Sequence, residues 1–250
     1  MSILLNISSD SRQPNESTDN FTVNFQPNVP LLGGNYGIAL EACSLWYSFY
    51  NISGDYNNTT FRYYNGSVFK NITITPGLYA IDDINAFVQA QMKANGDYTS
   101  TPGGDVFYIT LTPNYNTFKL RITISSSYQV DLTVGNLYQL FGFDPIVVTT
   151  TQEGSNNVNI TNGIDRILIH IDCVSGSFAG TQSSDVIYSF SPDGAPSSLL
   201  QIKPYALIYL PLTKHGYLNQ LRVYVTDQQN RRVNLNNETV SLQLSLKKII

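Results

Sequence analysis

The chain has little charge and no long hydrophobic run. Only 13% of its 250 residues are charged, and 14 Lys+Arg against 18 Asp+Glu give a net charge of −4. A protein that mainly binds phosphate backbones needs a basic surplus, so we expect no specific nucleic-acid binding. No stretch approaches the ~20 apolar residues that a helix needs to span a bilayer, so we expect no membrane insertion. The hydrophobic content of 42% excludes a disordered chain.

Cysteine is also scarce. Cys43 and Cys173 are too few for a small secreted module that is held together by disulfides. Both lie in strongly apolar stretches, which favours two buried thiols in strands. One bridge between them is the alternative, and the sequence leaves the pairing open.

A signal peptide is missing as well. Residues 1–7 lack the basic start and the apolar length of such a segment, which predicts a product made inside the cell. An excess of Asn-x-Ser/Thr sequons points the other way, because the composition predicts about four or five by chance. The sequons begin at Asn6, Asn15, Asn20, Asn51, Asn57, Asn58, Asn65, Asn71, Asn159 and Asn237. We interpret them as Asn- and Thr-rich strands and turns, with a glycosylated surface protein as the alternative.

Most of the chain alternates apolar and polar residues with a period of two, which predicts strands with one face on a core. The alternating runs are 21–25, 36–40, 107–111, 118–124, 221–225 and 242–246. Two further runs, Ile167–Ile171 and Tyr205–Leu210, are apolar nearly throughout, which is typical of strands covered on both faces. Turns rich in Gly and Asn separate the runs. Many short strands with such turns predict an all-β sandwich or barrel.

One segment, residues 80–94, has helical spacing instead. Its apolar residues recur every three or four positions: Ile81, Ile84, Val88 and Met92. Acidic residues in the first turn and Lys93 in the last turn suit the helix dipole, and a following Asn-Gly pair ends the helix. We predict one surface helix inserted in a long connection, and a shorter helical turn at 137–141.

The sequence shows no internal repeat and no linker with a clear change of composition. Residues 1–19 are polar and predict a flexible N-terminal arm. Residues 20–250 are predicted to form a single domain.

The search for catalytic or metal-binding residues finds no constellation. His170 lies in the middle of a predicted strand, as a packed or solvent-facing residue, and His215 belongs to a turn. Zinc sites need three or four closely spaced Cys or His ligands, and the common nucleophile and phosphate-loop motifs are missing too. Asp82 and Asp83 suit the helix dipole better than a catalytic pair, and Asp55 has oxygen-rich neighbours but no complete Ca²⁺ loop. We therefore predict no enzymatic activity, no cofactor and no metal, and assign no catalytic or cofactor-binding residue.

The 17 Tyr and 12 Phe need an explanation, and two dense runs stand out at Trp46–Tyr50 and Phe61–Tyr64. Packing in a sheet explains aromatic residues in strands. The first run, however, would place large rings on both faces of one strand. The second face would then meet a partner protein or stack on a sugar, and all three interpretations stay open. Lys247 and Lys248 form a short basic patch near the chain end.

Several segments, taken in order, resemble one protein family. Ile74–Asn85 resembles the Pro-Gly-x-Tyr and Ile-acidic-Asp-Ile-Asn motifs in the penton (minor capsid) proteins of Polinton/Maverick elements, adintoviruses and virophages. Leu140–Pro145 resembles their Leu-Gly-Phe turn, with Phe141 in place of a second small apolar residue, and Ser183–Phe190 resembles their Ser-Asp-Val-Leu-Tyr stretch. The other matching segments are Phe61–Tyr63, Lys203–Tyr205, Tyr209–Pro211, Val225–Gln228 and Val240–Leu246. The resemblance covers roughly residues 20–248.

This resemblance implies a single jelly-roll β-sandwich of antiparallel strands in residues 20–250, with the helix inserted at about 80–94. It implies a non-enzymatic penton subunit, five copies of which close each fivefold vertex of an icosahedral capsid in the virion. The implied partners are further copies in a homopentamer, a double jelly-roll major capsid protein, and vertex-associated or receptor proteins. The major capsid protein is roughly twice as long, so the 250 residues here fit the penton.

Two other functions stay open. A cell-surface or secreted jelly-roll binding module, lectin-like or tumour-necrosis-factor-like, is favoured by the sequons and opposed by the missing signal peptide. A glycan-active enzyme on a β-sandwich would need a pair of carboxylates in a groove, which distant strands can bring together.

Overall fold

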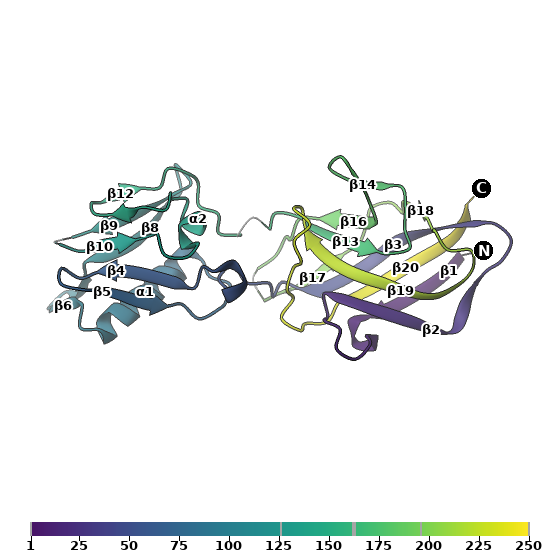
Figure 1. Cartoon of the computed structure of the whole chain (residues 1–250), viewed down its shortest axis with the longest axis horizontal. Coiled ribbons are helices and arrows are strands. Elements are labelled where there is room, and N and C mark those ends of the chain that lie inside the picture. The colour runs from purple at the N-terminus through teal and green to yellow at the C-terminus, as the bar shows by residue number, and fades with distance from the viewer. Residues whose placement is uncertain (1, 126, 162–163, 196, 250) are drawn as a thin grey trace. The chain divides into compact units, whose positions relative to one another are not determined.

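The computed structural model describes residues 2–125, 127–161, 164–195 and 197–249. The chain folds as two compact units, each with its own hydrophobic core (Figure 1). Unit 1 consists of Met1–Phe49 and Ile164–Ile250, and unit 2 is the continuous segment Tyr50–Gly163. Within the described part of the chain, no helix has both the length and the apolar character needed to cross a membrane.

Unit 1 has two main antiparallel sheets. The first has the order β1 (Ser2–Ser8), β20 (Ser241–Ile249), β3 (Asn35–Trp46) and β17 (Leu199–Ile202), with β18 (Leu210–Pro211) also on β3. The second has the order β16 (Val186–Phe190), β13 (Ile167–Ile171), β19 (Gly216–Asp227) and β2 (Asn20–Leu31). A hairpin of β14 (Ser177–Ala179) and β15 (Gln182–Ser184) and a short 3₁₀ turn (Ser9–Ser11) complete the unit.

The strand pairs of unit 1 are nested. The first main strand pairs with the last, β1 with β20, and the second pairs with the next to last, β2 with β19. Inside them β3 pairs with β17, and β13 pairs with β16. A long hairpin rolled into two sheets in this way is a jelly-roll. The predicted single jelly-roll is therefore confirmed, and it lies in unit 1.

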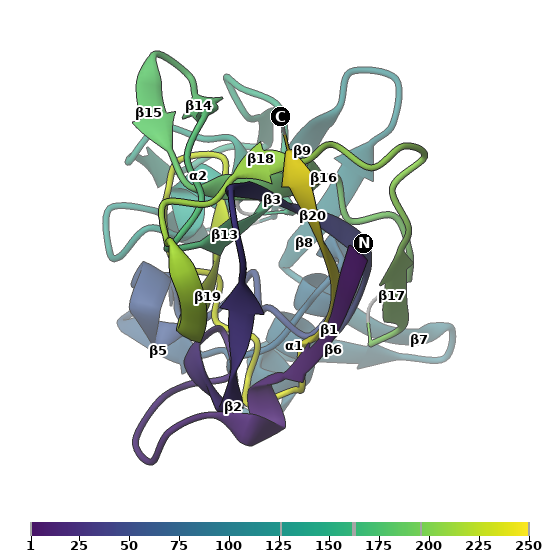
Figure 2. The same cartoon turned by 90° about the vertical axis from the view of Figure 1, so that its right-hand side faces the viewer.

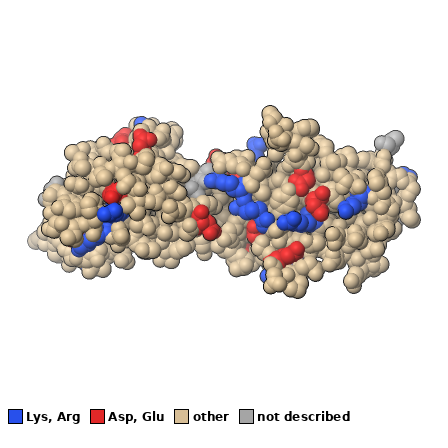
Figure 3. All heavy atoms as spheres, viewed as in Figure 1, with Lys and Arg blue, Asp and Glu red and all other residues tan. Residues whose placement is uncertain are grey.

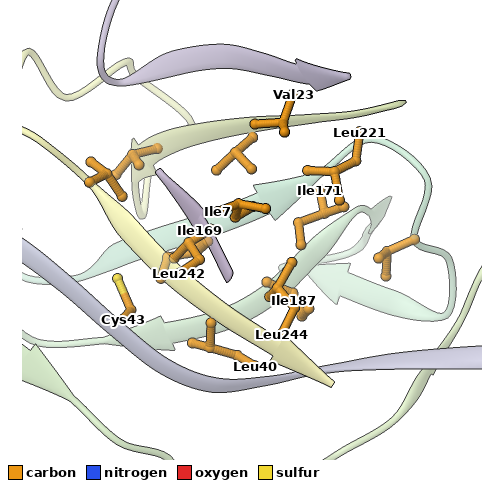
Figure 4. Close-up of a cluster of buried hydrophobic side chains, with 14 of the residues drawn as sticks. Ile7, Val23, Leu40, Cys43, Ile169, Ile171, Ile187, Leu221, Leu242 and Leu244 are labelled. Carbon is orange, nitrogen blue, oxygen red and sulfur yellow. The ribbon is translucent and has the colours of Figure 1, made fainter. Parts of the chain in front are cut away.

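The core of unit 1 lies between these two sheets. Leu242, Leu244 and Leu246 of β20 are buried, while Gln243 between them points outward. Figure 4 shows Leu242 and Leu244 in the same cluster as Ile169 of β13. Burial of each such side chain contributes ~1.5–3 kcal/mol. All of β13 is buried, as its unbroken apolar run predicts.

The N-terminal segment differs from the predicted flexible arm. Ser2–Ser8 forms β1 and pairs with β20 along its whole length, so the two ends of the chain lie side by side (Figure 2). Leu5 and Ile7 face the core, whereas Leu4 points away from it and is half exposed. The following segment is also held, since the Glu16 carboxylate accepts hydrogen bonds from the backbone amide and the hydroxyl of Thr22, both at 2.7 Å.

The apolar run Tyr205–Leu210 also differs from its prediction as a covered strand. Only Leu210 belongs to a strand, and Tyr205, Leu207 and Ile208 are exposed. A proline precedes this run and another follows Leu210, and prolines restrict the backbone and remove donors from a sheet. The segment is therefore a loop between β17 and β18.

Unit 2 combines short sheets with two helices. Its sheets have the orders β11 (Val147–Val148), β10 (Gln129–Asp131), β4 (Thr60–Tyr64), β5 (Phe69–Thr73), and β12 (Gln152–Glu153), β9 (Lys119–Ile124), β8 (Ile109–Asn114). The strands β6 (Tyr98–Thr101) and β7 (Gly104–Phe107) form a hairpin. The helices are α1 (Ile81–Ala94) and α2 (Leu137–Phe141), and a 3₁₀ turn covers Gly54–Tyr56.

Both predicted helices are confirmed. The buried residues of α1 are the four that the spacing predicted: Ile81, Ile84, Val88 and Met92. The Asp83 carboxylate accepts a hydrogen bond from the Ala80 amide at 2.9 Å, which satisfies a free donor at the helix start. The Asn85 side chain accepts a bond from the Leu111 amide at 2.8 Å, which ties α1 to β8.

The division into two units differs from the predicted single domain. Unit 2 enters the jelly-roll between its third and fourth main strands, β3 and β13, and has a core of its own. Both units are β-rich and low in charge, so no change of composition marks the boundaries in the sequence.

Candidate functional site

An exposed apolar surface of unit 1 lies beside the edge strand β16. It consists of Phe178, Tyr205, Leu207 and Ile208, which we call the apolar edge patch. Tyr205 is fully exposed, and Phe178 and Ile208 each expose about 70% of their surface. An adjacent groove of about 310 Å³ is lined by Ser177, Val186, Tyr188, Pro204, Ala206 and Ile208, among others. Water-facing apolar groups of this size mark contact surfaces.

The anchoring of the loop explains why these side chains point outward. The loop is fixed through Tyr209, whose hydroxyl lies 3.1 Å from that of Ser245 on β20. The Lys247 ammonium lies 5.7 Å from the centre of the same ring. Gly37 makes room, because a Cβ there would meet the Tyr209 Cβ at 3.0 Å. Tyr209 is therefore held against the sheet, while Tyr205 to Ile208 stay free.

The hairpin β14–β15 carries Phe178 and stands out from the rest of unit 1 (Figure 2). Its turn contains Gly180 with a positive φ of 62°, a conformation that glycine adopts without strain. The Ser177 hydroxyl donates to the Ser184 carbonyl at 2.7 Å, which closes the base of the hairpin. Phe178 is thus presented on a fixed support.

A second candidate is the polar cluster on the outer side of β13 and β19. His170 Nδ1 lies 2.7 Å from an Asp185 oxygen, and its Nε2 lies 2.8 Å from the Thr226 hydroxyl. The Tyr224 hydroxyl donates to both Asp185 oxygens at 2.8 Å, and its ring stacks on His170 with centroids 4.3 Å apart. Burial, and then the neighbouring Asp185 carboxylate, raise the pKa of Tyr224.

The Thr226 hydroxyl, the His170 ring and the Asp185 carboxylate follow one another in the order of a nucleophile–base–acid triad. Thr226 and His170 are both buried, however, and the Thr226 hydroxyl also has the Asp227 carbonyl as an acceptor at 3.1 Å. A pocket of about 540 Å³ lies above, with Arg222 and Arg232 on its walls. These arginines are engaged by Asn20 and Asp19. The geometry therefore suits a satisfied polar network that fixes β16 against β13 and β19.

Charged side chains of both signs lie next to one another on the face of unit 1 seen in Figure 3, and most of the remaining surface is neutral. Among the charges of unit 1 are the pairs Arg232–Asp19 at 2.7 Å and Arg231–Asp227 at 2.6 Å. Paired charges of this kind leave little net field to attract a strongly charged ligand. The surface suits protein contacts more than binding of a polyanion.

Unit 2 contains a buried acid of its own. The Asp97 carboxylate accepts hydrogen bonds from the Tyr63 hydroxyl at 2.6 Å, the Lys70 ammonium at 2.8 Å and the Asn65 amide at 3.1 Å. Burial alone would raise the pKa of Asp97, but these hydrogen bonds outweigh it and lower that pKa. Burial and the Asp97 charge raise the pKa of the adjacent Tyr128 to about 12. The cluster holds β4, β5 and the end of α1 together.

Unit 2 also exposes two aromatic side chains next to a groove. Tyr115 and Phe118 lie at the β8–β9 turn and are mostly exposed, beside an apolar groove of about 310 Å³ that Ile81 and Ile160 help to line. Phe118 has a positive φ of 56°, which is uncommon for a bulky residue. Its carbonyl accepts a hydrogen bond from the Val158 amide at 2.9 Å, which holds the turn.

The two aromatic runs, Trp46–Tyr50 and Phe61–Tyr64, differ in secondary structure: only the second lies entirely within a strand. In the first, β3 ends at Trp46, so the predicted strand with rings on both faces does not extend to residue 50. The chain turns there, and the Ser48 amide donates to the Trp46 carbonyl at 2.9 Å. Phe49 is buried in unit 1, and Trp46 stays partly exposed. The second run forms β4, where alternate rings enter the core of unit 2.

The cysteines are free and buried, as favoured by the sequence. Cys43 lies in β3, and Cys173 lies in the turn after β13. Burial raises the pKa of each thiol to about 12.

The structure places the remaining candidate residues of the sequence analysis in turns and strands. Asp55 lies in a 3₁₀ turn that is capped by Ser53, and His215 is exposed before β19. Lys247 and Lys248 lie within β20 instead of a loose chain end. Among the described residues no group of three or more His, Cys, Asp or Glu side chains is placed to hold a metal ion.

Sequence reasoning missed the apolar edge patch and the polar cluster. The patch has one sequence signal, the two prolines that flank 205–210, which argue against a central strand. The cluster has none, because Asp185 and Tyr224 are distant from His170 in sequence and only the fold brings them together.

The nested strands of unit 1 define a single jelly-roll β-sandwich, into which unit 2 is inserted as a separate compact unit. A crystal structure of the selenomethionine-labelled mavirus penton protein has this fold. The match covers 100% of this chain and 100% of that protein, with a TM-score of 0.50 and 10% sequence identity. No family model and no curated protein sequence matches the chain. The likeness in fold agrees with the penton resemblance of the sequence motifs.

Proposed function

We propose that this chain is a penton subunit of an icosahedral capsid, in which five copies close each fivefold vertex of the virion. The observation that carries the proposal is the likeness in fold to the mavirus penton protein over both whole chains. The sequence motifs independently resemble those of the same kind of protein in Polinton-like elements and virophages.

The physical character of unit 1 supports this role. Its sheets enclose one continuous core, and the first and last strands are paired, which ties both ends of the chain into the scaffold. The chain is low in charge and rich in Tyr, Asn and Thr, which suits contacts between subunits. Such a protein acts by shape and contact, and the proposal assigns it no reaction and no cofactor.

The proposed partners are further copies of the chain and a double jelly-roll major capsid protein around the vertex. Unit 2, with Tyr115 and Phe118 exposed, is the proposed contact for a vertex-associated or receptor protein. In a fivefold ring each contact joins two different patches of neighbouring copies, and the rotation closes the ring.

The native mass of the purified chain, measured by size exclusion with light scattering, tests the proposal. Five chains of 27.8 kDa give about 139 kDa. A trimer would favour a surface-ligand protein of the tumour-necrosis-factor kind and contradict the proposal. A monomer that also fails to bind assembled major capsid protein would contradict it as well.

A further inference from the structure

We propose that the apolar edge patch of unit 1 is the surface with which one copy of this chain contacts the next. The inference rests on the proposed self-assembly and specifies where it occurs. The occupant is a second copy, whose receiving surface is the opposite edge of its sandwich.

The patch contains anchors of the kind that dominate protein interfaces. Tyr205 is fully exposed, so the ring has no packing partner within its own unit. Ile208 on the same loop is exposed, and so is Phe178, whose neighbour Ser177 lines one groove with Ile208; the loop 204–209 carries no charge. Large aromatic side chains at the centre of a neutral patch contribute most of the energy of many interfaces.

The area of the patch fits a stable contact between proteins. A fully exposed aromatic side chain offers ~150–250 Å² of surface, so the four side chains together expose on the order of 500 Å². A standard interface buries ~800 Å² on each partner, with an apolar centre and a polar rim. The patch supplies such a centre, and Ser177 and Ser189 beside the groove suit the rim.

The backbone next to the patch is also unpartnered. β16 pairs with β13 on one side, and among the described residues no strand pairs with its other side. Natural edge strands carry charges or prolines that block pairing, whereas Val186–Phe190 contains neither. This edge therefore has no strand partner within the described part of the chain, and the loop 204–208 lines the groove beside it.

The order of strands identifies the receiving surface. The strands β17 and β16 lie at one end of the two sheets, and β1 and β2 lie at the other end. A contact between two identical patches stops at two copies, whereas a contact between different patches can close a ring. β1 offers the exposed side chain of Leu4 on a free edge, which suits an apolar contact.

The test compares three variants of the full-length chain with the wild type. The patch variant is Tyr205→Ser with Ile208→Ser, and the receiving-edge variant is Leu4→Lys. The matched control is Val68→Ser with Val106→Ser, which removes two exposed apolar side chains from unit 2. Mass is followed by light scattering over a dilution series, and melting curves check that each variant is folded.

We expect the patch variant to assemble at least ~100-fold more weakly, because hot-spot side chains cost a factor of ten or more each. Leu4→Lys should also weaken assembly, and the unit 2 control should assemble like the wild type. If a folded patch variant assembles like the wild type, the patch assignment is wrong while self-assembly stands. Normal assembly of Leu4→Lys would overturn the opposite-edge contact. A wild-type chain that never assembles would contradict both the proposed self-assembly and this surface.

Discussion

Unit 1 and unit 2 are both rich in β-strands, but the sequence separation between paired strands differs between them. In unit 1, Ser2 pairs with Lys247, and the nested strands require both ends of the chain. In unit 2, neighbouring strands form hairpins, as in the pairs Thr60–Thr73 and Ile109–Ile124. Local pairing has a low cost of loop closure, so a continuous segment can fold as an insertion. The jelly-roll scaffold and its inserted unit can therefore vary separately.

The units also differ in the groups that form hydrogen bonds to a carboxylate in each. Each has a carboxylate that accepts a hydrogen bond from a tyrosine hydroxyl: the partly exposed Asp185 from Tyr224 and the buried Asp97 from Tyr63. Unit 1 adds a histidine to its acid, whereas unit 2 adds a lysine. Buried polar groups are expensive unless satisfied, so each cluster stabilises only the unit that contains it.

The largest expected effect comes from opening a cavity in one core. Leu244→Ala in β20 should destabilise unit 1 by about 2–5 kcal/mol, because the side chain is fully buried. Trp46 is the one tryptophan and lies in unit 1, so its fluorescence reports that unit alone. Met92→Ala should destabilise unit 2 instead and leave the Trp46 transition unchanged. Equal shifts of the Trp46 transition in both variants would show that the units unfold together.

The next effect concerns the polar cluster of unit 1. His170→Leu removes a partner from both Asp185 and Thr226, and the loss should cost about 1–3 kcal/mol of unfolding free energy. Denaturant unfolding followed by Trp46 fluorescence measures it. His215→Leu is the matched control, since this exposed turn residue should stay within about 0.5 kcal/mol of the wild type. Equal unfolding free energies of the two variants would contradict the structural role assigned to His170.

The buried acid of unit 2 should make that unit sensitive to acid. Because the pKa of Asp97 is lowered by folding, its stabilisation is present above the unfolded value of ~3.9 and is lost as the pH falls through the folded pKa. Asp97→Asn should lower stability at neutral pH by about 1–3 kcal/mol and flatten the acid dependence.

Amide hydrogen exchange of α1, measured from pH 7 down to pH 3, reports unit 2. Asp55→Asn serves as the control and should keep the wild-type profile. An Asp97→Asn profile as steep as that of the wild type would assign the acid sensitivity to another group.

The smallest effect is at the start of α1. Asp83→Ala removes the acceptor of the Ala80 amide and should cost about 0.5–1 kcal/mol, seen as faster exchange in the first helical turn. Asp82→Ala keeps that hydrogen bond, so it should show a smaller loss that salt screens. If the two variants behave alike, the dipole and not the hydrogen bond accounts for the effect.

Local patterns predict the elements of this chain well. The spacing of Ile81, Ile84, Val88 and Met92 identifies the buried face of α1, and the unbroken apolar run identifies β13. These succeed because each element buries its own side chains by a simple period. Strand β1 is not predicted, because the polar residues of 1–19 suggest an arm and its partner β20 lies at the other end of the chain.

Features that depend on contacts between distant segments are harder to predict from the sequence. Residues 205–210 and 167–171 are equally apolar, but only the second run is covered within the chain. A periodicity cannot say whether the covering surface belongs to the same molecule or to another. For the same reason, the His170–Asp185–Tyr224 cluster and the boundary between the units appear only when distant strands are placed together.

The rotational symmetry of the purified, assembled protein tests the central claim most directly. Class averages of single particles from electron microscopy of the full-length chain give this symmetry without a prior assumption. The account predicts closed rings with fivefold symmetry, which heterologous contacts between identical subunits can form. Closed particles with threefold or twofold symmetry would contradict the penton assignment.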